Sequence, residues 1–343
     1  MALLEVKNLC TCFQTRKGTV RAVDGVSFTL DKGKTLAIVG ESGSGKSVTA
    51  MSVLRLLDEN GSIESGEILF EENGEKVDLA KIPLEKMYGI RGNRISMIFQ
   101  EPMTALNPVF TIGRQLSEPF LIHQGMTKKQ AWEEALRMLK AVRIPNAEGV
   151  MKDYAHHLSG GMRQRVMIAM ALSCRPKILI ADEPTTALDV TIQAQILELM
   201  KDLQKENAAA ILFITHDLGV VHEIADDVAV TYCGQVVERA PAPRIFENSE
   251  CSHPYTEGLL ISAPSGKNAK KRLESIPGSV PSPFHIPKGC RFAPRCKYCT
   301  EKCIGEMPSL FDIGEGQAIR CFYPKKEERR SDEHRRLIIR KET

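Results

Sequence analysis

Residues 40–47 read GESGSGKS, a glycine-rich stretch on which the interpretation of the rest of the chain depends. It fits the pattern G-x-x-x-x-G-K-[ST] completely, follows the apolar run TLAIVG at 35–40 and precedes a segment expected to be helical. Glycines let such a loop curve around phosphate oxygens, while its N–H groups and the helix start supply positive potential. We expect Lys46 to reach the β- and γ-phosphates and the Ser47 hydroxyl to complete a Mg²⁺ shell. This phosphate loop (residues 40–47) therefore predicts a nucleoside triphosphate site.

The pattern around the loop predicts an α/β domain that is interrupted by helices. The run at 35–40 is continuously apolar, as in a strand buried on both faces of a parallel sheet. From about 101 to 158 the pattern is helical, with a capping box made by Thr127 and Gln130. From 175 to 233 strand and helix signals alternate again. The helical block is therefore expected to be an insertion into one α/β domain.

A triphosphate site of this kind needs a carboxylate partner, and the stretch KILIADEP at 177–184 offers one. It reads as a hydrophobic strand that ends in two acids. Asp182 would hold Mg²⁺ through water, and Glu183 would act as the general base on the attacking water. An Asp-Glu pair is a weak signal alone, but it becomes specific beside the phosphate loop.

The composition sets broad limits on the class of protein. Hydrophobic residues make up 43% of the 343 residues, charged residues 26%, and the formal net charge is +3, which argues against a dedicated nucleic-acid binder. The longest apolar run, at 208–215, is far shorter than the roughly 20 residues of a membrane span. The first residues lack the pattern of a signal peptide. We therefore expect a cytosolic chain with reduced thiols.

The stretch LSGGMRQR at 158–165 resembles the signature motif of the ATP-binding cassette family closely. Ser159 can cap a helix, and the N–H groups of Gly160 and Gly161 at that helix start make a second anion site. The resemblance implies a P-loop NTPase core with an inserted helical subdomain. It also implies a head-to-tail dimer, in which this turn covers the γ-phosphate held by the opposite protomer.

Further positions match the motifs of this family. Gln100 matches the Q-loop glutamine, Asp189 in ALD matches the D-loop, and His216 in FITHD matches the switch histidine. Phe13 stands where the family keeps an aromatic that stacks on adenine. The resemblance implies Glu183, His216 and Gln100 as catalytic residues. It implies that Mg²⁺ is held by Ser47, Gln100 and Asp182. The residues implied for ATP binding are Phe13, Ser42, Gly43, Ser44, Gly45, Lys46, Ser47, Val48, Ser159, Gly160, Gly161 and Asp189.

Three further stretches resemble the ATPase subunits of bacterial dipeptide and oligopeptide importers, in particular the D-type subunit. They are the segment at 99–119 after the Q-loop, HPYTEGLL at 253–260, and GCRFAPRC at 289–296. The resemblance implies a peripheral ATPase on the cytoplasmic membrane face. Its partners would be two membrane-spanning permease subunits and a paralogous second ATPase, with an extracytoplasmic peptide-binding protein as an indirect partner and no nucleic acid. The alternative is a soluble cassette ATPase that acts on ribosomes or DNA.

This resemblance also predicts the division of the chain. A cassette domain is expected over 1–250, with its helical subdomain at about 101–158. A C-terminal importer extension is expected over 251–343, with a metal-binding segment at 290–321. Between the extension's first motif and its cysteines, the Pro-, Ser- and Lys-rich stretch at 262–287 reads as a linker or surface wrap.

Five of the ten cysteines gather near the end of the chain: Cys290, Cys296, Cys299, Cys303 and Cys321. Four thiolates suffice for zinc or for a [4Fe–4S] cluster. The staggered spacing fits a cluster better than the paired knuckles of a zinc site, with zinc and free thiols as the alternatives. The resemblance implies Cys290, Cys296, Cys303 and Cys321 as ligands and leaves Cys299 spare. A structural role and a redox role both remain open, and peptide preference is not readable from this chain.

Overall fold

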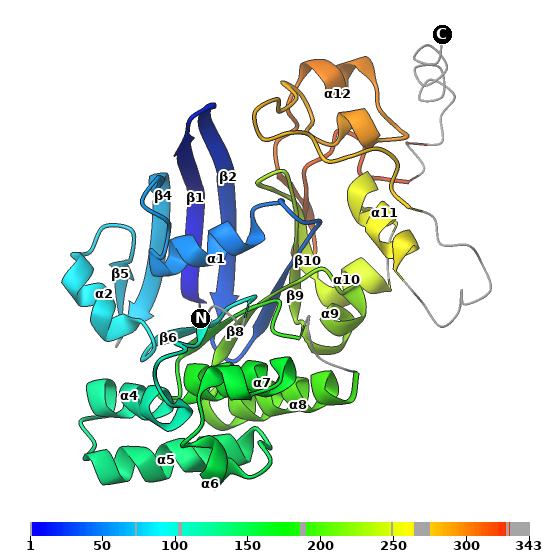
Figure 1. Cartoon of the computed structure of the whole chain (residues 1–343). Helices are drawn as coiled ribbons and strands as arrows, with labels where there is room; N and C mark the ends of the chain where they lie inside the picture. The colour runs from blue at the N-terminus through cyan, green and yellow to red at the C-terminus, as the bar shows by residue number, and fades with distance from the viewer. Residues whose placement is uncertain are drawn as a thin grey trace. The chain divides into compact units, whose positions relative to one another are not determined.

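The computed structural model describes residues 2–72, 74–101, 105–185, 190–247, 250–263, 275–326 and 329 (Figure 1). These residues form two compact units. The first unit holds residues 1–4, 30–35 and 70–214, and the second holds 5–29, 36–69 and 215–343. Among the described residues, we find no helix that combines the length and the apolar character needed to cross a bilayer.

The first unit contains three parallel strands, which are β6 (Ile95–Ile98), β7 (Ile178–Asp182) and β8 (Ala210–Thr215), neighbouring one another in the order β8-β7-β6. Every residue of the three strands is buried. Continuous burial of this kind is what a parallel strand covered on both faces requires. The shorter β5 (Glu75–Asp78) and α2 (Leu84–Ile90) also belong to this unit. The alternation of strands and helices expected over 175–233 is therefore confirmed for the residues up to 214, which belong to this unit.

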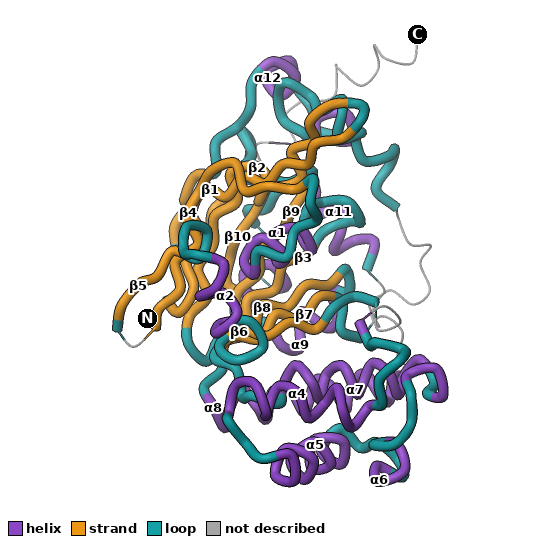
Figure 2. The backbone as a smooth tube through the Cα atoms, turned by 60° about the vertical axis from the view of Figure 1, so that its left-hand side comes forward, coloured by secondary structure: helices purple, strands orange, loops and turns teal. Residues whose placement is uncertain are grey.

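The helices of the first unit are α4 (Ile112–Gln124), α5 (Lys128–Ala141), α6 (Ala147–Val150), α7 (Gly160–Leu172) and α8 (Val190–Asn207). A short 3₁₀ helix covers Ala155–His157. The predicted capping box is confirmed, because Thr127 and Gln130 exchange both hydrogen bonds at the start of α5. The helices α4 and α5 pack together and against α7, and Figure 2 shows α4 and α7 side by side.

The second unit is built on two sheets. The long strands β1 (Ala2–Thr15), β2 (Gly18–Asp31) and β4 (Gly61–Glu72) neighbour one another in the order β2-β1-β4. In the other sheet, β3 (Thr35–Val39) runs parallel to β9 (Asp227–Tyr232). The strands β10 (Gln235–Pro241), β12 (Gln317–Ile319) and β11 (Phe311–Gly314) continue this sheet in antiparallel fashion. Strands from the end of the chain thus extend the sheet that contains β3.

The helices of the second unit are α1 (Lys46–Leu54), α9 (Leu218–Ile224), α10 (Ala242–Phe246), α11 (Pro254–Ser262) and α12 (Glu301–Gly305), with a 3₁₀ helix at Ala293–Arg295. Helix α10 packs against α9, β9 and β10 (Figure 1). The proposed linker at 262–287 lies partly outside the described residues, and 275–287 holds neither helix nor strand.

The C-terminal residues share a hydrophobic core with β3 and β9. Tyr255 and Phe292 are buried in the cluster that contains Val39 and Val230. The Tyr255 ring lies 4.7 Å from the ring of Tyr232, and the Phe292 ring lies 5.3 Å from it. Aromatic rings at these separations pack favourably beyond their buried area. The C-terminal residues are therefore an integral part of the second unit.

Candidate functional site

The phosphate loop leaves β3 at Val39 and enters α1 at Lys46, as the sequence predicts. Gly40 and Gly45 both have positive φ, of 156° and 95°. A Cβ atom on Gly40 would lie 2.2 Å from the Thr231 carbonyl oxygen, and one on Gly45 would lie 2.5 Å from that of Ala22. Only glycine fits at these two positions, so the curve of the loop is fixed by close backbone contacts.

The loop is anchored on one side and open on the other. Lys46 is 6% exposed, and its Nζ donates to the carbonyl oxygens of Gly40 at 2.8 Å and Glu41 at 3.0 Å. The Ser44 hydroxyl hydrogen-bonds to that of Thr231, whereas Ser42 and its neighbour Gly43 are exposed. The next residues, Ser47 and Val48, are half-buried in the first turn of α1. A helix start with open N–H groups of this kind suits an anion.

The acidic pair lies at the end of β7. Asp182 is the last residue of the strand and is 1% exposed. Glu183 has a φ of 46°, which is unusual for a residue with a side chain, and its N–H donates to the Ile214 carbonyl oxygen at 2.8 Å. Strained backbone persists where the surroundings hold it, and it concentrates at functional sites. The turn directs Glu183 away from the course of the strand.

The structure brings Gln100 and Glu183 together. Strands β6 and β7 are parallel neighbours, with Ile98 opposite Ala181, so both residues follow their strands at the same sheet edge. The Gln100 side-chain amide donates to the Glu183 carboxylate at 3.3 Å. The two residues that the motifs select as water-orienting glutamine and general base therefore contact each other within the first unit.

The signature turn is confirmed as a capped helix start. The Ser159 hydroxyl accepts the N–H of Met162 at 3.3 Å at the beginning of α7, a helix of 13 residues. Ser159 and Gly160 are exposed, and Gly161 is half-exposed. The N–H groups of this turn are therefore accessible to an anion from outside the chain.

Sequence reasoning missed Gln164, which anchors the same helix. Its side-chain amide donates to the carbonyl oxygen of Pro184, and the residue is 1% exposed. Pro184 directly follows Glu183, so α7 is tied to the turn that carries the acid. Gln164 lies between two arginines at the start of the helix, so the sequence carries no signal that this side chain is buried.

The other residues assigned from the cassette motifs are His216, Phe13 and Asp189, and each has its own surroundings. His216 is exposed in the turn between β8 and α9, and the following Asp217 caps α9 by accepting the Gly219 N–H at 2.8 Å. Phe13 is half-buried on β1 with its ring against Gly61, where a Cβ atom would lie 2.7 Å from the ring. Asp189 lies outside the described residues.

Four cysteines line one cavity of about 370 Å³ in the second unit, and they are Cys290, Cys296, Cys303 and Cys321. Cys299 does not line it. Within the described ranges, no group of three or more His, Cys, Asp or Glu side chains is arranged to hold a metal ion.

The cavity disfavours charged thiolates. Burial raises the pKa of Cys296 to about 12 and that of Cys321 to about 11, and repulsion from the other thiols of the group adds to both shifts. The N–H of Tyr323 donates to the Cys321 sulfur at 3.4 Å. Thiolate ligands in this cavity would need a positive centre to compensate their charge.

Models of known families match two parts of the chain. The ABC transporter model matches residues 23–186, and the model of the oligopeptide/dipeptide transporter C-terminal region matches residues 237–303. A model of an AAA domain also matches residues 154–222, which contain the signature turn, the acidic pair and His216. The matched regions thus cover the phosphate loop, the signature turn and four of the five C-terminal cysteines.

Relatives match nearly the full length. The oligopeptide transport ATP-binding protein AppD of Bacillus subtilis is 54% identical over 326 residues, which cover 95% of this chain and 98% of that protein. A protein of Brucella ovis named as a peptide import ATP-binding protein is 50% identical, covering 93% and 96%.

Solved cassette structures share the fold. The dimeric ATP-binding cassette MJ0796 bound to ADP and Pi is 26% identical with a TM-score of 0.62, covering 70% of this chain and 98% of that chain. The cassette cbiO1 from Clostridium perfringens is 28% identical with a TM-score of 0.58, covering 72% and 91%. The expected P-loop NTPase fold is thereby confirmed. With the phosphate loop, the signature turn and a full-length relative in agreement, the chain belongs to the ATP-binding cassette ATPases that carry the oligopeptide/dipeptide transporter C-terminal region.

Proposed function

We propose that this chain is the D-type ATP-hydrolysing subunit of an importer for dipeptides or oligopeptides. The observation that carries the proposal is the 54% identity to an oligopeptide transport ATP-binding protein over 95% of the chain. That match includes the importer extension as well as the cassette. The alternative, a soluble cassette ATPase that acts on ribosomes or DNA, is not supported by an observation as specific as this match.

In the proposed chemistry Glu183 takes the proton from the attacking water, and Gln100 orients that water. Their hydrogen bond of 3.3 Å supports this pairing. Lys46 and the loop N–H groups bind the phosphates, and His216 contacts the γ-phosphate. The oxygen donors of Ser47, Gln100 and the buried Asp182 suit Mg²⁺, which would neutralise charge on the phosphates.

Two chains, or this chain and a paralogous ATPase, would meet head to tail around ATP. The exposed signature turn supports this arrangement, because it offers N–H groups that its own chain leaves accessible. The proposed ATP contacts are Phe13, Ser42, Gly43, Ser44, Gly45, Lys46, Ser47, Val48, Ser159, Gly160, Gly161 and Asp189. The bond from Gln164 to Pro184 would link the signature turn of each chain to its own general base.

The surface proposed to receive the permease lies within residues 99–119, which include the described loop 105–110 before α4. Gln115 is buried and holds this loop: its side-chain oxygen accepts the Asn107 N–H at 2.8 Å, and its amide donates to the Phe110 carbonyl at 2.9 Å. The loop presents Val109, which is 70% exposed. A rigid loop with an exposed apolar tip suits a protein partner.

The proposed assembly lies on the cytoplasmic membrane face. It contains two permease subunits, this ATPase and its paralogue, and it receives peptide from an extracytoplasmic binding protein. The cassette would span 1–250, with its helical subdomain at about 101–158, and the importer extension 251–343. The separate model match at 237–303 supports an extension that begins in this region.

Reconstitution tests this function. The five-component transporter is placed in lipid vesicles, and uptake of labelled dipeptide or oligopeptide is measured with ATP supplied to the cassette side. We expect uptake to follow ATP hydrolysis, and the same transporter with Glu183→Gln to do neither. Assembly without peptide-dependent hydrolysis, together with stimulation of the isolated chain by ribosomes or DNA, would favour the alternative.

We also propose that Cys290, Cys296, Cys303 and Cys321 hold a [4Fe–4S] cluster that stabilises the folded C-terminal extension. The pocket that these four cysteines line, and that Cys299 does not line, supports the choice of four ligands. A tetrahedral zinc ion needs its four sulfurs only about 3.8 Å apart, from Zn–S bonds of about 2.3 Å, whereas a cluster binds each thiolate to a different iron and spaces them further.

Anaerobic purification tests the cluster. We expect about four irons per chain and a broad absorbance in the visible blue for a [4Fe–4S] cluster. About one zinc per chain without iron would support the zinc alternative, and neither metal would support free thiols.

A further inference from the structure

The carboxylate of Glu41, a residue of the phosphate loop, is held by Arg295, a residue of the cysteine segment. One guanidinium nitrogen lies 2.5 Å from Glu41 Oε2, and the other lies 3.0 Å from Oε1. The Arg295 side chain is 4% exposed and that of Glu41 is 31% exposed. A two-point contact of this kind fixes both the position and the orientation of the carboxylate.

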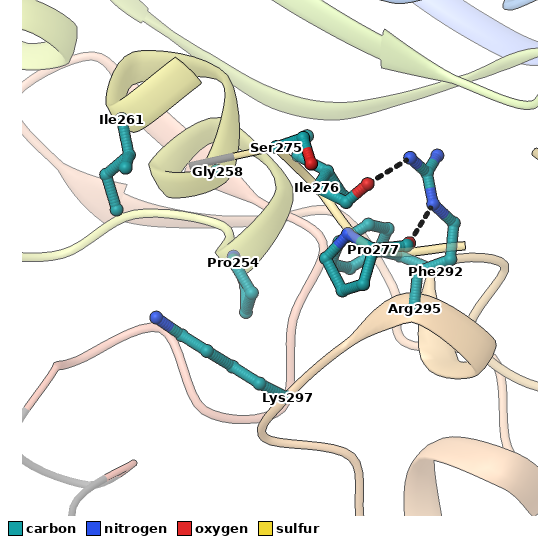
Figure 3. A pocket seen from close by; sticks show the side chains of 9 residues that line it. All are labelled: Pro254, Gly258, Ile261, Ser275, Ile276, Pro277, Phe292, Arg295 and Lys297. Carbon is teal, nitrogen blue, oxygen red and sulfur yellow. Dashed lines mark hydrogen bonds between the residues drawn. The ribbon is translucent and has the colours of Figure 1, made fainter. Parts of the chain in front are cut away.

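Arg295 is itself fixed from other directions. Its Nε donates to the Pro277 carbonyl at 2.9 Å, and its Nη2 lies 3.5 Å from that of Ile276 (Figure 3). These contacts lie beside a pocket of about 500 Å³ that α11 and the cysteine segment line. The guanidinium therefore has little freedom to follow Glu41, and the loop must adopt the position that Arg295 sets.

The extension holds the backbone of Glu41 as well. The Glu41 N–H donates to the Tyr255 hydroxyl at 2.8 Å, while the Glu41 carbonyl accepts from Lys46 Nζ at 3.0 Å. Tyr255 belongs to α11 and is fully buried. One residue of the loop thus connects the extension to the lysine that binds phosphate.

A second arginine supports the other side of the loop. Arg291 pairs with Asp24 and donates to the Cys233 carbonyl. The residue after Cys233 is Gly234, whose N–H donates to the Ser44 carbonyl of the loop at 2.9 Å. Arg291 follows Cys290 in the chain, just as Arg295 precedes Cys296, so the fold of the cysteine segment sets both arginines.

We propose that the C-terminal extension holds the phosphate loop in its ATP-binding conformation, with Arg295 as a positioning residue that acts through Glu41. ATP affinity of the cassette then depends on an ordered cysteine segment. The proposal rests on the ATPase function above. Its test uses ATP and the full-length chain without permease or peptide, so its failure would leave peptide import untouched.

The first test is Arg295→Met, which keeps the length of the side chain and removes its charge. We expect the Kd for ATP to rise about tenfold, as loss of preorganisation in a ground-state contact would give. In the ATPase assay of the same full-length chain, KM for ATP should rise by a similar factor while kcat changes little. Arg295→Lys should restore part of the affinity. The matched control is Lys297→Met, because Lys297 is 58% exposed and pairs with Glu257, away from the loop.

A double-mutant cycle separates positioning from general loss of structure. Glu41→Gln lies outside the cysteine segment and should raise the Kd for ATP by a similar factor in a chain that is still folded at the temperature of the titration. Adding Arg295→Met to it should change little more, since both substitutions break one contact. Wild-type ATP affinity in a folded Arg295→Met chain, or effects of the two substitutions that simply add, would overturn the proposal.

Discussion

Gln100 donates a hydrogen bond of 3.3 Å to the carboxylate of Glu183, which joins the segment after β6 to the strand end that carries the acid. The same segment continues to residues 105–110, the loop proposed to meet the permease. The proposed general base and the loop proposed to meet the permease thus belong to segments that one side-chain contact joins, and this contact can be tested by mutation.

Replacing Glu183 with Gln is expected to stop turnover and retain ATP. The amide preserves the shape and the contact with Gln100 but cannot accept a proton, so kcat should fall by a factor of about 10² to 10⁴. The Kd for ATP should change less than about twofold, because the phosphate contacts remain. Rapid-quench assays and equilibrium titration measure the two quantities. Turnover close to that of the wild type would show that another group takes the proton.

Replacing Gln164 with Leu is expected to uncouple the signature helix from the catalytic turn. The substitution removes the donor to the Pro184 carbonyl in a buried position, and a buried polar group without a partner costs about 1–3 kcal/mol. Urea unfolding should register this loss, and kcat should fall more than ATP affinity. The exposed Gln14 offers a control, since Gln14→Leu should change neither quantity. Equal effects of the two substitutions would remove the assigned role from Gln164.

The local parts of the site could be predicted because their physical causes lie close together in the sequence. The curve of the phosphate loop depends on glycines within it, and the turn at Ser159 caps its own helix. The box of Thr127 and Gln130 is equally local. Motif resemblance added the choice of four cysteines out of five, and the four chosen do line one cavity without Cys299.

The long-range contacts could not be predicted from the same patterns. Arg295 and Glu41 are 254 positions apart, and both are common surface residue types. Only the packing of Phe292 and Tyr255 against β9 explains why this arginine reaches the loop. For Trp132 the local pattern itself misleads. This residue shares the apolar helical repeat of α5 and would be expected to be buried, yet it is 38% exposed. A helical repeat of apolar residues identifies the apolar face of a helix, but it does not show how much of that face other helices or strands cover.

Replacing Cys296 with Ser is expected to remove the proposed cluster without unfolding the cassette. Cys296 lines the shared cavity, and serine is a poor ligand for iron, so iron should fall from about four per chain to near zero. The thermal midpoint should drop, because a metal that binds only the folded chain stabilises it. Cys299→Ser is the matched control and should retain full iron. Equal loss from both variants would contradict the assigned ligand set.

The motif HPY at 253–255 places a neutral histidine in the core of the second unit. The His253 N–H donates to Glu238 Oε2 at 2.8 Å, and its Nδ1 accepts the Tyr255 N–H at 3.1 Å at the start of α11. Burial lowers the pKa of His253 to about 3, and repulsion from Arg329 and Arg320 adds to the shift. Burial also raises the pKa of Glu238. The unfolded chain therefore binds a proton at His253 at a higher pH than the folded chain does.

This difference predicts loss of stability in mild acid. Between pH 6.5 and about 3 only the unfolded chain is protonated at His253, so this residue should contribute a loss of about 2 kcal/mol on acidification from pH 7 to 5. Glu238 works in the opposite sense between pH 4.5 and its raised folded-state pKa, because there only the folded chain holds the proton. His253→Asn keeps a cap for α11 but cannot titrate, so acidification from pH 7 to 5 should lower its urea-unfolding free energy by about 2 kcal/mol less than that of the wild type. The exposed His285 is the control, and His285→Asn should keep the wild-type slope. Parallel pH profiles for the wild type and His253→Asn would place the acid sensitivity elsewhere.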